Sequence, residues 1–406
     1  MAEVNVFETV KLLERDHDVP WERYHGEVRK RFASQDMEWL RDFAIMLLAR
    51  VGASDFSKRI HEALRALALL PGKHAFEFLM LLGNEEPVWT SSRSRSHANG
   101  RARVLGAVLG QAQPLEAFAS PIGADFPEPT QDLLACWLQE AVLRGKPVAD
   151  HANLLAVWER LKASGHELAT ATPELELILG ELEQGQPELT TSYSLLGASS
   201  WGGYIRPLDE PISGGMSNRV FRDVTKPDMV GRLAAFSASA RAVSNGEAEV
   251  RALLAEQPVA ATEVDAAFIR SLPLSCITTV SYPDGRPLVS PPTSAKDRAA
   301  TSIAVEPIST RALFELLMMS ASNGGDYNTA WSGAYGRLAA RRTFSALVGA
   351  AEHDPWERVE QLARECTAWS FTTNSPWFYE ISADLGVLVL QPDKQTLTVA
   401  ACTDTD

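Results

Sequence analysis

The side chains best suited to binding or catalysis lie near the C-terminal end, beside several glycines. Asp326, Tyr335 and Arg337 belong to the run ASNGGDYNTAWSGAYGRLAARR, which begins at Ala321. Glycine lets a backbone approach a ligand closely, so this run favours a cleft. Asp326 and Tyr335 are then acid or base candidates, and Arg337 is a candidate for binding an anionic group. The competing interpretation is a capped helix start whose aromatic side chains pack on a sheet.

Five further candidates accompany this run. Arg219 ends a loop that begins at Trp201, and the predicted cleft lies between that loop and residues 326–337. The other four stand closer to the C-terminal end, and they are Trp377, Tyr379, Asp404 and Asp406. The two aspartates are spaced to bind a cation, but they lack a third ligand.

Familiar catalytic and cofactor-binding motifs are missing from the sequence. It contains no GxxxxGK[ST] run and no GxGxxG after a predicted strand. His61-Glu62 and His166-Glu167 each begin like a zinc-protease helix, yet neither has a second histidine four residues later. We therefore expect neither a metal nor a cofactor.

The formal net charge of -14 limits the class of partner. A surface of this sign repels phosphate, so we expect no nucleic acid and instead a basic protein partner. One local exception is a Ser/Arg stretch with a possible phosphate-binding patch, although a solvated loop is the favoured interpretation; it contains Arg93, Arg95, Arg101 and Arg103.

The cysteines and the N-terminal residues indicate the compartment. Cys136, Cys276, Cys366 and Cys402 are scattered singly, without the spacing of a zinc cage or a disulfide framework. The N-terminus is acidic with a helical pattern, and no apolar run is long enough to span a membrane. These features predict a cytoplasmic protein without membrane contact, and they leave the oligomeric state open.

Apolar periodicity divides the chain into three parts. Residues 1–188 carry the three- and four-residue spacing of consecutive amphipathic helices, which predicts a helical bundle or an irregular helical array. Residues 189–231 are rich in Gly, Ser and Pro, and we expect an irregular connection there.

Residues 232–406 mix helical and strand patterns, and we expect an α+β domain with an antiparallel sheet. The predicted helices are Glu247–Leu254, Thr310–Ser320, Trp331–Val348 and Trp356–Glu365. The predicted strands are Leu274–Tyr282, its short hairpin partner Pro287–Ser290, Ala368–Thr372, Trp377–Ile381, Leu385–Leu390 and Thr396–Cys402.

The C-terminal third also resembles a known family. The runs GGDYNTAWSGAYGRLAARR, SPWFYEISADLGVLVL and VAACTDTD resemble an uncharacterised actinobacterial family, the domain of unknown function 6183. The resemblance implies no activity. It implies only that the Tyr335-Gly336-Arg337 segment, with Trp377, Tyr379, Asp404 and Asp406, belongs to a recurring pattern of that family. Arg341 departs from the pattern, which has tryptophan there.

Two functions are compatible with these observations. The first is a protein–protein interaction or regulatory role, in which an acidic helical surface binds a basic partner. The alternative is an enzyme of specialised metabolism, with its cleft between the loop ending at Arg219 and the segment of Asp326, Tyr335 and Arg337.

Overall fold

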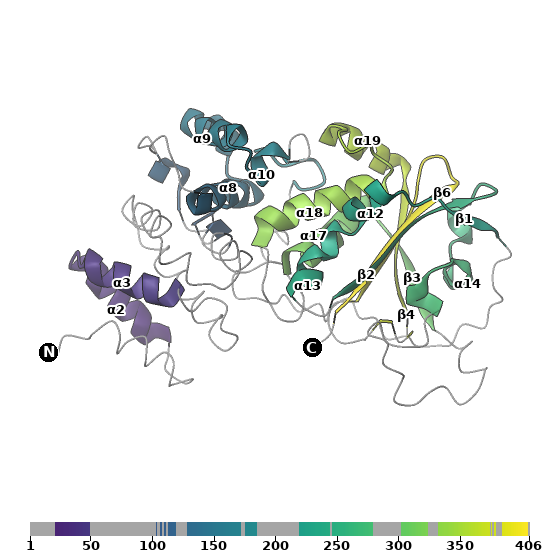
Figure 1. The fold of residues 1–406 in the computed structure, drawn as a ribbon, viewed down its shortest axis with the longest axis horizontal. Coiled ribbons are helices and arrows are strands. Elements are labelled where there is room, and N and C mark those ends of the chain that lie inside the picture. The colour runs from purple at the N-terminus through teal and green to yellow at the C-terminus, as the bar shows by residue number, and fades with distance from the viewer. Residues whose placement is uncertain are drawn as a thin grey trace.

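A computed structural model gives the fold (Figure 1). It describes residues 21–48, 103, 106, 107, 109, 110, 113–118, 128–171, 175–184, 219–243, 246–278, 302–323, 332–373, 375, 377, 378 and 384–404. Every structural statement below concerns these residues.

A six-stranded sheet organises the C-terminal part. Its strands lie in the order β1-β2-β6-β5-β4-β3, and each neighbouring pair is antiparallel. The last strand in the sequence therefore lies in the interior of the sheet, between β2 and β5. The strands are β1 (Phe221–Asp223), β2 (Glu247–Ala255), β3 (Ile303–Ile308), β4 (Thr367–Thr373), β5 (Leu385–Leu390) and β6 (Thr396–Thr403).

Both faces of the sheet are covered, which explains why β5 is apolar at every position. Side chains alternate between the two faces of a strand. Val387 and Val389 pack into one apolar core with the helices α17 and α18, while Leu388 and Leu390 pack into a second core beside α14. Figure 1 accordingly shows α17 and α18 on one side of the sheet and α14 on the other.

Seven helices lie between these strands in the sequence, within the described residues. Two of them, α17 and α18, are the longest and pack on each other. They are α12 (Pro227–Leu233), α13 (Ala238–Val243), α14 (Ala266–Ser271), α15 (Ser275–Thr278), α17 (Thr310–Asn323), α18 (Ser332–Leu347) and α19 (Trp356–Glu365), with the 3₁₀ turns η4 (Ala235–Ser237) and η5 (Ala261–Glu263).

The N-terminal part contains helices without any strand in its described residues. Helix α8 is buried along much of its length and packs on α18 of the C-terminal part. The elements are α2 (Trp21–Ala33), α3 (Met37–Leu48), η1 (Leu115–Phe118), α8 (Glu128–Leu143), η2 (Val148–Asp150), α9 (Ala152–Ala163) and α10 (Glu167–Thr170). None of the helices described here is long and apolar enough to cross a membrane.

The predicted α+β class is confirmed, and three individual elements were predicted wrongly. Trp377 and Phe378, in the predicted strand Trp377–Ile381, belong to no strand of the sheet, and residues 379–381, like the predicted strand at 287–290, lie outside the described part. Glu247–Leu254, predicted as a helix, is strand β2, because pairing with β1 and β6 on its two sides outweighs its helix-forming composition. Within Leu274–Tyr282, predicted as a strand, residues 275–278 form the short helix α15, and residues 279–282 lie outside the described part. The division at residues 188 and 231 stays a prediction, although β1 and most of α12 fall between those limits.

Candidate functional site

Arg337 lies fully buried on α18, where its own chain uses every N–H of the guanidinium group. Nε and Nη2 donate to Glu183 over 2.8 Å each, and Nη2 also donates to the carbonyl oxygen of Ile178 over 2.6 Å. Nη1 donates to Gln139 over 2.7 Å and to the carbonyl oxygen of Glu176 over 2.8 Å. A guanidinium group has five N–H donors, so none is left for an anionic ligand.

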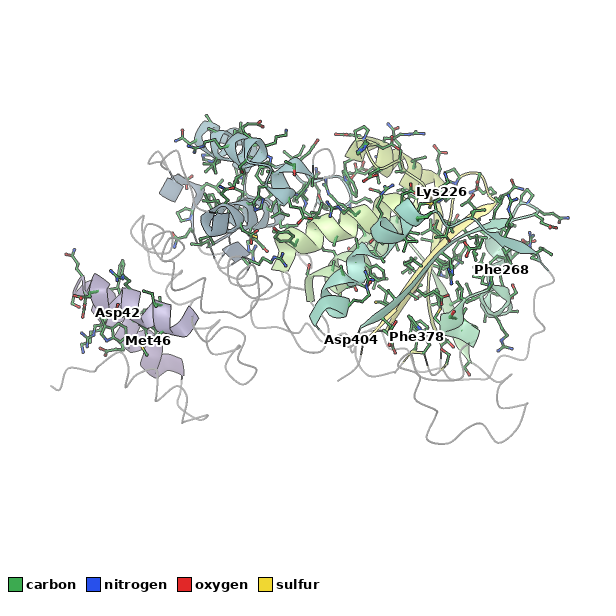
Figure 2. The ribbon with its side chains drawn as sticks, in the orientation of Figure 1. Asp42, Met46, Lys226, Phe268, Phe378 and Asp404 are labelled. Carbon is green, nitrogen blue, oxygen red and sulfur yellow. The ribbon has the colours of Figure 1, made fainter. Side chains whose placement is uncertain are left out.

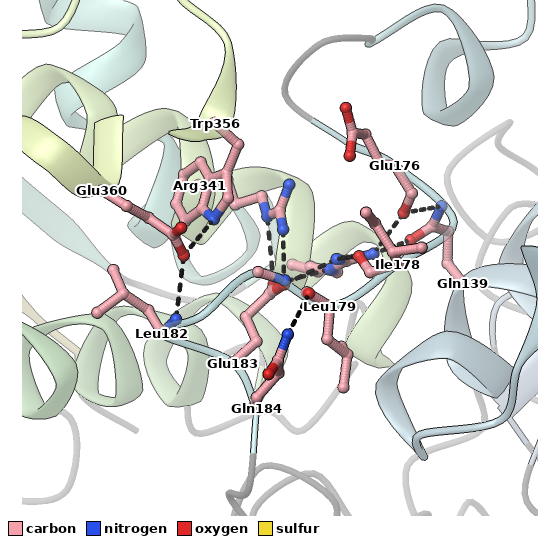
Figure 3. Close-up of polar contacts among 12 residues, drawn as sticks. Gln139, Glu176, Ile178, Leu179, Leu182, Glu183, Gln184, Arg341, Trp356 and Glu360 are labelled. Carbon is pink, nitrogen blue, oxygen red and sulfur yellow. Dashed lines mark hydrogen bonds and ion pairs between the residues drawn. The ribbon is translucent and has the colours of Figure 1, made fainter. Parts of the chain in front are cut away.

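Glu183 is the centre of this buried cluster (Figure 3). Its carboxylate also accepts two hydrogen bonds from Arg341, at 3.2 Å from Nε and 2.6 Å from Nη2. The Arg341 guanidinium lies 4.1 Å from the ring centre of Trp356. Burial by itself raises the pKa of a carboxyl group, but the charges and hydrogen bonds of Arg337 and Arg341 outweigh it and hold the pKa of Glu183 well below its ordinary value.

Glu183 reaches α18 because residues 175–184, which we call the strap, run across α18 and α19 (Figure 3). Glu360 on α19 accepts hydrogen bonds from the backbone N–H of Leu182 and from Nε1 of Trp356, each over 3.0 Å. The strap has a glycine at its closest approach, since a Cβ on Gly180 would lie 2.1 Å from Nε1 of Trp356. The Arg337 cluster therefore joins the helical part to the C-terminal part.

Tyr335 lies two residues before Arg337 on α18 and contacts a second group of buried polar side chains. Its hydroxyl donates to Asp132 over 2.7 Å, and His166 Nε2 lies 3.3 Å from the same carboxylate oxygen. The thiol of Cys136 is 3.8 Å from that oxygen, and the Arg103 guanidinium lies 3.8 Å above the Tyr335 ring. Burial and the charge of Asp132 raise the pKa of Tyr335 far above its ordinary value. Tyr335 is therefore a poor acid or base at neutral pH.

A cavity of about 580 Å³ lies between the two parts of the chain. Arg103 and residues of α10 line the cavity from the N-terminal part. Residues of α12, η4, α13 and α18 line it from the C-terminal part, together with Glu352 and His353, which lie between α18 and α19. Tyr335 contributes to its wall. The charged and histidine side chains at the cavity are Arg103, Arg232, Arg241, Arg342, His353, Glu167, Asp228 and Glu352.

The charge of this lining differs from that of the whole chain. Carboxylates outnumber Lys and Arg in the sequence, 52 to 38, whereas the cavity has four arginines and three carboxylates. The lining therefore has one more arginine than carboxylate, whereas the chain as a whole is strongly acidic.

Arg219, a predicted site residue, lies at a different place in the fold. It precedes β1, forms an ion pair of 2.5 Å with Glu263, and donates to the carbonyl oxygens of Gln257 and Pro258. Arg219 contributes nothing to the lining of the cavity in the described residues. The structure thus does not bring it together with Tyr335 and Arg337.

Two other predicted site residues are buried in or beside the sheet. Trp377 packs in the apolar core with Phe378, on the side of the sheet where Figure 2 shows Phe268 and Phe378. Asp404 follows β6 and is 1% exposed, next to Thr403, whose hydroxyl donates to Asp384 over 2.6 Å. Both positions are closed to a dissolved ligand.

The remaining predicted site residues fall outside the described part of the chain. They are Asp326, Tyr379 and Asp406, together with the loop from Trp201 as far as residue 218. Within the described residues, no group of three or more His, Cys, Asp or Glu side chains has the geometry to hold a metal ion.

Sequence reasoning missed most of the residues that line the cavity or support its wall. Arg103 had a signal, because it belongs to the Ser/Arg stretch weighed as a phosphate-binding patch. The pattern of His166-Glu167 indicates only an incomplete zinc motif, yet His166 contacts Asp132 and Glu167 lines the cavity. Arg232 and Arg241 gave no signal, since single arginines on amphipathic helices look like surface residues.

The comparisons with known proteins return one family. The model described as "Family of unknown function (DUF6183)" matches residues 22–406. This corrects the resemblance, which placed the likeness in the C-terminal third only. The wider match agrees with the contacts, because Tyr335 and Arg337 find their partners between residues 132 and 183. No curated protein and no solved structure matches the chain.

Proposed function

Since the chain belongs to DUF6183, a family of unknown function, we propose from its geometry that it binds a small anionic molecule in the cavity between its two parts. The observation that carries the proposal is the inverted charge of the lining, with four arginines in a chain of net charge -14. The volume of about 580 Å³ is that of a small-molecule site.

Binding is favoured over catalysis by the state of the predicted catalytic groups. Tyr335 holds its proton against Asp132, and Arg337 has no free donor. An enzyme of specialised metabolism, the catalytic alternative, needs another acid or base. His353 lines the cavity and has the side chain for that role.

A thermal-shift screen against small carboxylates, phosphate esters and sulfonates tests the proposal. A ligand at 100 times its Kd stabilises the folded state by about 2.7 kcal/mol, which raises the melting midpoint by several degrees. We expect Arg241→Gln to reduce or remove this rise, because Arg241 is exposed at the cavity.

Arg222→Gln is the matched control. Arg222 is an exposed arginine on β1, away from the cavity lining, and its loss changes the net charge equally. The control should keep the full rise. Equal rises in both variants, or no rise with any anion, would contradict the proposal.

The second proposal is a protein–protein interaction or regulatory role with a basic partner, and the net charge of -14 supports it. Two exposed carboxylates of the N-terminal part, Glu167 and Glu181, pair with Arg342 and Arg364. Affinity capture from native lysate should return a stoichiometric basic protein whose binding weakens with salt. Capture without such a protein would count against this role.

A further inference from the structure

One pair of charges in the cavity is already neutralised. Arg342 on α18 forms an ion pair of 3.2 Å with Glu167 on α10, across the two parts of the chain. The other two carboxylates of the lining, Asp228 and Glu352, are not part of this pair.

Two arginines of the lining are bonded only to neutral acceptors. Both terminal nitrogens of Arg232 lie 3.2 Å from the carbonyl oxygen of Ala350, and Nη2 of Arg241 lies 3.2 Å from that of Ala234. These bonds orient the guanidinium groups. They leave the positive charges without a carboxylate partner among the described residues.

The two carboxylates are likewise left without a cation. Asp228 and Glu352 are exposed at the cavity, and neither forms a salt bridge within the described part of the chain. Arg232 stands one turn after Asp228 on α12, the spacing that favours a helix pair. Its side chain turns to Ala350 instead, so the opposite charges remain separate.

We infer that the ligand carries a protonated amine as well as an anionic group, in the manner of an amino acid or a short peptide. The inference rests on the proposed function, because it assigns the second end of the same ligand. The arginines bind the anionic group, while Asp228 and Glu352 bind the ammonium group.

This arrangement favours a ligand with both charges over a simple anion, which can still bind to the arginines but more weakly. A ligand with only negative charge would sit beside two carboxylates, and repulsion between like charges lowers its affinity. A ligand with both charges meets a complementary group at each end. The volume of about 580 Å³ suits a molecule of this size class.

Titration calorimetry of the full chain with capped peptides tests the inference. The probes are a set of dipeptides, the same dipeptides N-acetylated, and the same dipeptides C-amidated. Acetylation removes the positive charge and amidation removes the negative charge. We expect the free dipeptides to bind, and each cap to weaken binding by at least about tenfold.

The outcomes separate the inference from the proposed function. Equal binding of N-acetylated and free dipeptides overturns the inference that the site recognises an amine, but it does not contradict the proposed anion site. Equal binding of C-amidated and free dipeptides overturns the anion site. Absence of binding by every probe, while a simple anion binds in the thermal-shift screen, overturns the inference alone.

Variants of the carboxylates supply the second arm. In the double variant Asp228→Asn/Glu352→Gln, neither carboxylate is left to recognise the amine. N-acetylation should therefore weaken dipeptide binding by less than about threefold, instead of about tenfold. Glu256→Gln, an exposed carboxylate outside the cavity lining, should keep the full penalty. An unchanged penalty in the double variant would overturn the assignment.

Discussion

The single carboxylate of Glu183 pairs with two buried guanidinium groups, so its removal takes the same counter-charge from both of them. Arg337 and Arg341 are 0% and 1% exposed. Removing one partner of a buried ion pair typically destabilises a protein by about 3–5 kcal/mol. We expect Glu183→Gln to lower the free energy of unfolding by that amount in urea denaturation.

Glu181→Gln is the matched control, because Glu181 lies two residues away in the same strap. Its ion pair with Arg364 is more than half exposed on both sides. Exposed pairs contribute less than about 1 kcal/mol. A similar loss in the two variants would show that burial of the charges does not decide the effect.

The pH dependence of stability also follows from Glu183. Its pKa in the folded chain is lowered, so the stabilisation is complete above the unfolded pKa of about 4.3. This stabilisation is lost as the pH falls from about 4.3 towards the pKa of Glu183 in the folded chain. In that range the unfolded chain binds a proton at Glu183 and the folded chain does not.

We therefore expect the free energy of unfolding to depend more steeply on pH below about 4.3 in the parent chain than in Glu183→Gln. The difference is at most about 1.4 kcal/mol per pH unit, the value for one proton. Urea denaturation between pH 3 and 5 measures both slopes. Parallel slopes would contradict the assignment.

The sequence marks Arg337 and Tyr335 as chemically notable, but it cannot identify their partners. Gln139 and Glu183, on which Arg337 depends, lie more than 150 residues earlier in the chain. No spacing rule connects residues that far apart. The cavity escaped prediction for the same reason, since it exists only where α10 meets α12 and α18.

At the scale of elements, the strap depends on the absence of a side chain at Gly180. A Cβ there would lie 2.1 Å from Nε1 of Trp356 and 2.9 Å from a carboxylate oxygen of Glu360. Overpacking of this kind costs about 1–3 kcal/mol. We expect Gly180→Ala to lose that much stability in urea denaturation.

Gly231→Ala is the comparison, because Gly231 lies within α12 with no atom near the position of a Cβ. Alanine favours a helix over glycine by about 0.5–1 kcal/mol, so this variant should be neutral or more stable. If Gly180→Ala behaved like Gly231→Ala, the close packing of the strap would be disproved.

Elements with a strong local signal were predictable from the sequence. Helix α19 begins after Pro355 and spans Trp356–Glu365 as expected, and β5 spans the expected Leu385–Leu390. The run EAEVRALL of β2 has a helical composition and still forms a strand. Its pairing with β6 is a long-range contact, which local propensity does not record.

At the scale of the whole molecule, the Arg337 cluster and the Tyr335–Asp132 bond hold the helical part on the C-terminal part. Weakening the cluster should loosen both sides of the contact together. We expect Glu183→Gln to increase amide hydrogen exchange in α8, in the strap and in α18. Strands β5 and β6 should lose less protection than these segments, because their partners lie within the sheet.

Hydrogen–deuterium exchange with mass spectrometry measures these segments separately. Glu181→Gln serves again as the control and should leave all of them unchanged. A uniform increase that includes β5 and β6 would mean that the variant acts on global unfolding, and the cluster would then have no special role in docking.

The interior position of β6 has a consequence during synthesis of the chain. β2 is made first, and its partner β6 follows about 140 residues later, as the pairing of Leu254 with Thr396 requires. Until then, one edge of β2 and one edge of β5 are open to pairing with other chains. Closure of the sheet therefore waits for the synthesis of β6, and wrong association through these two edges is the hazard of that interval.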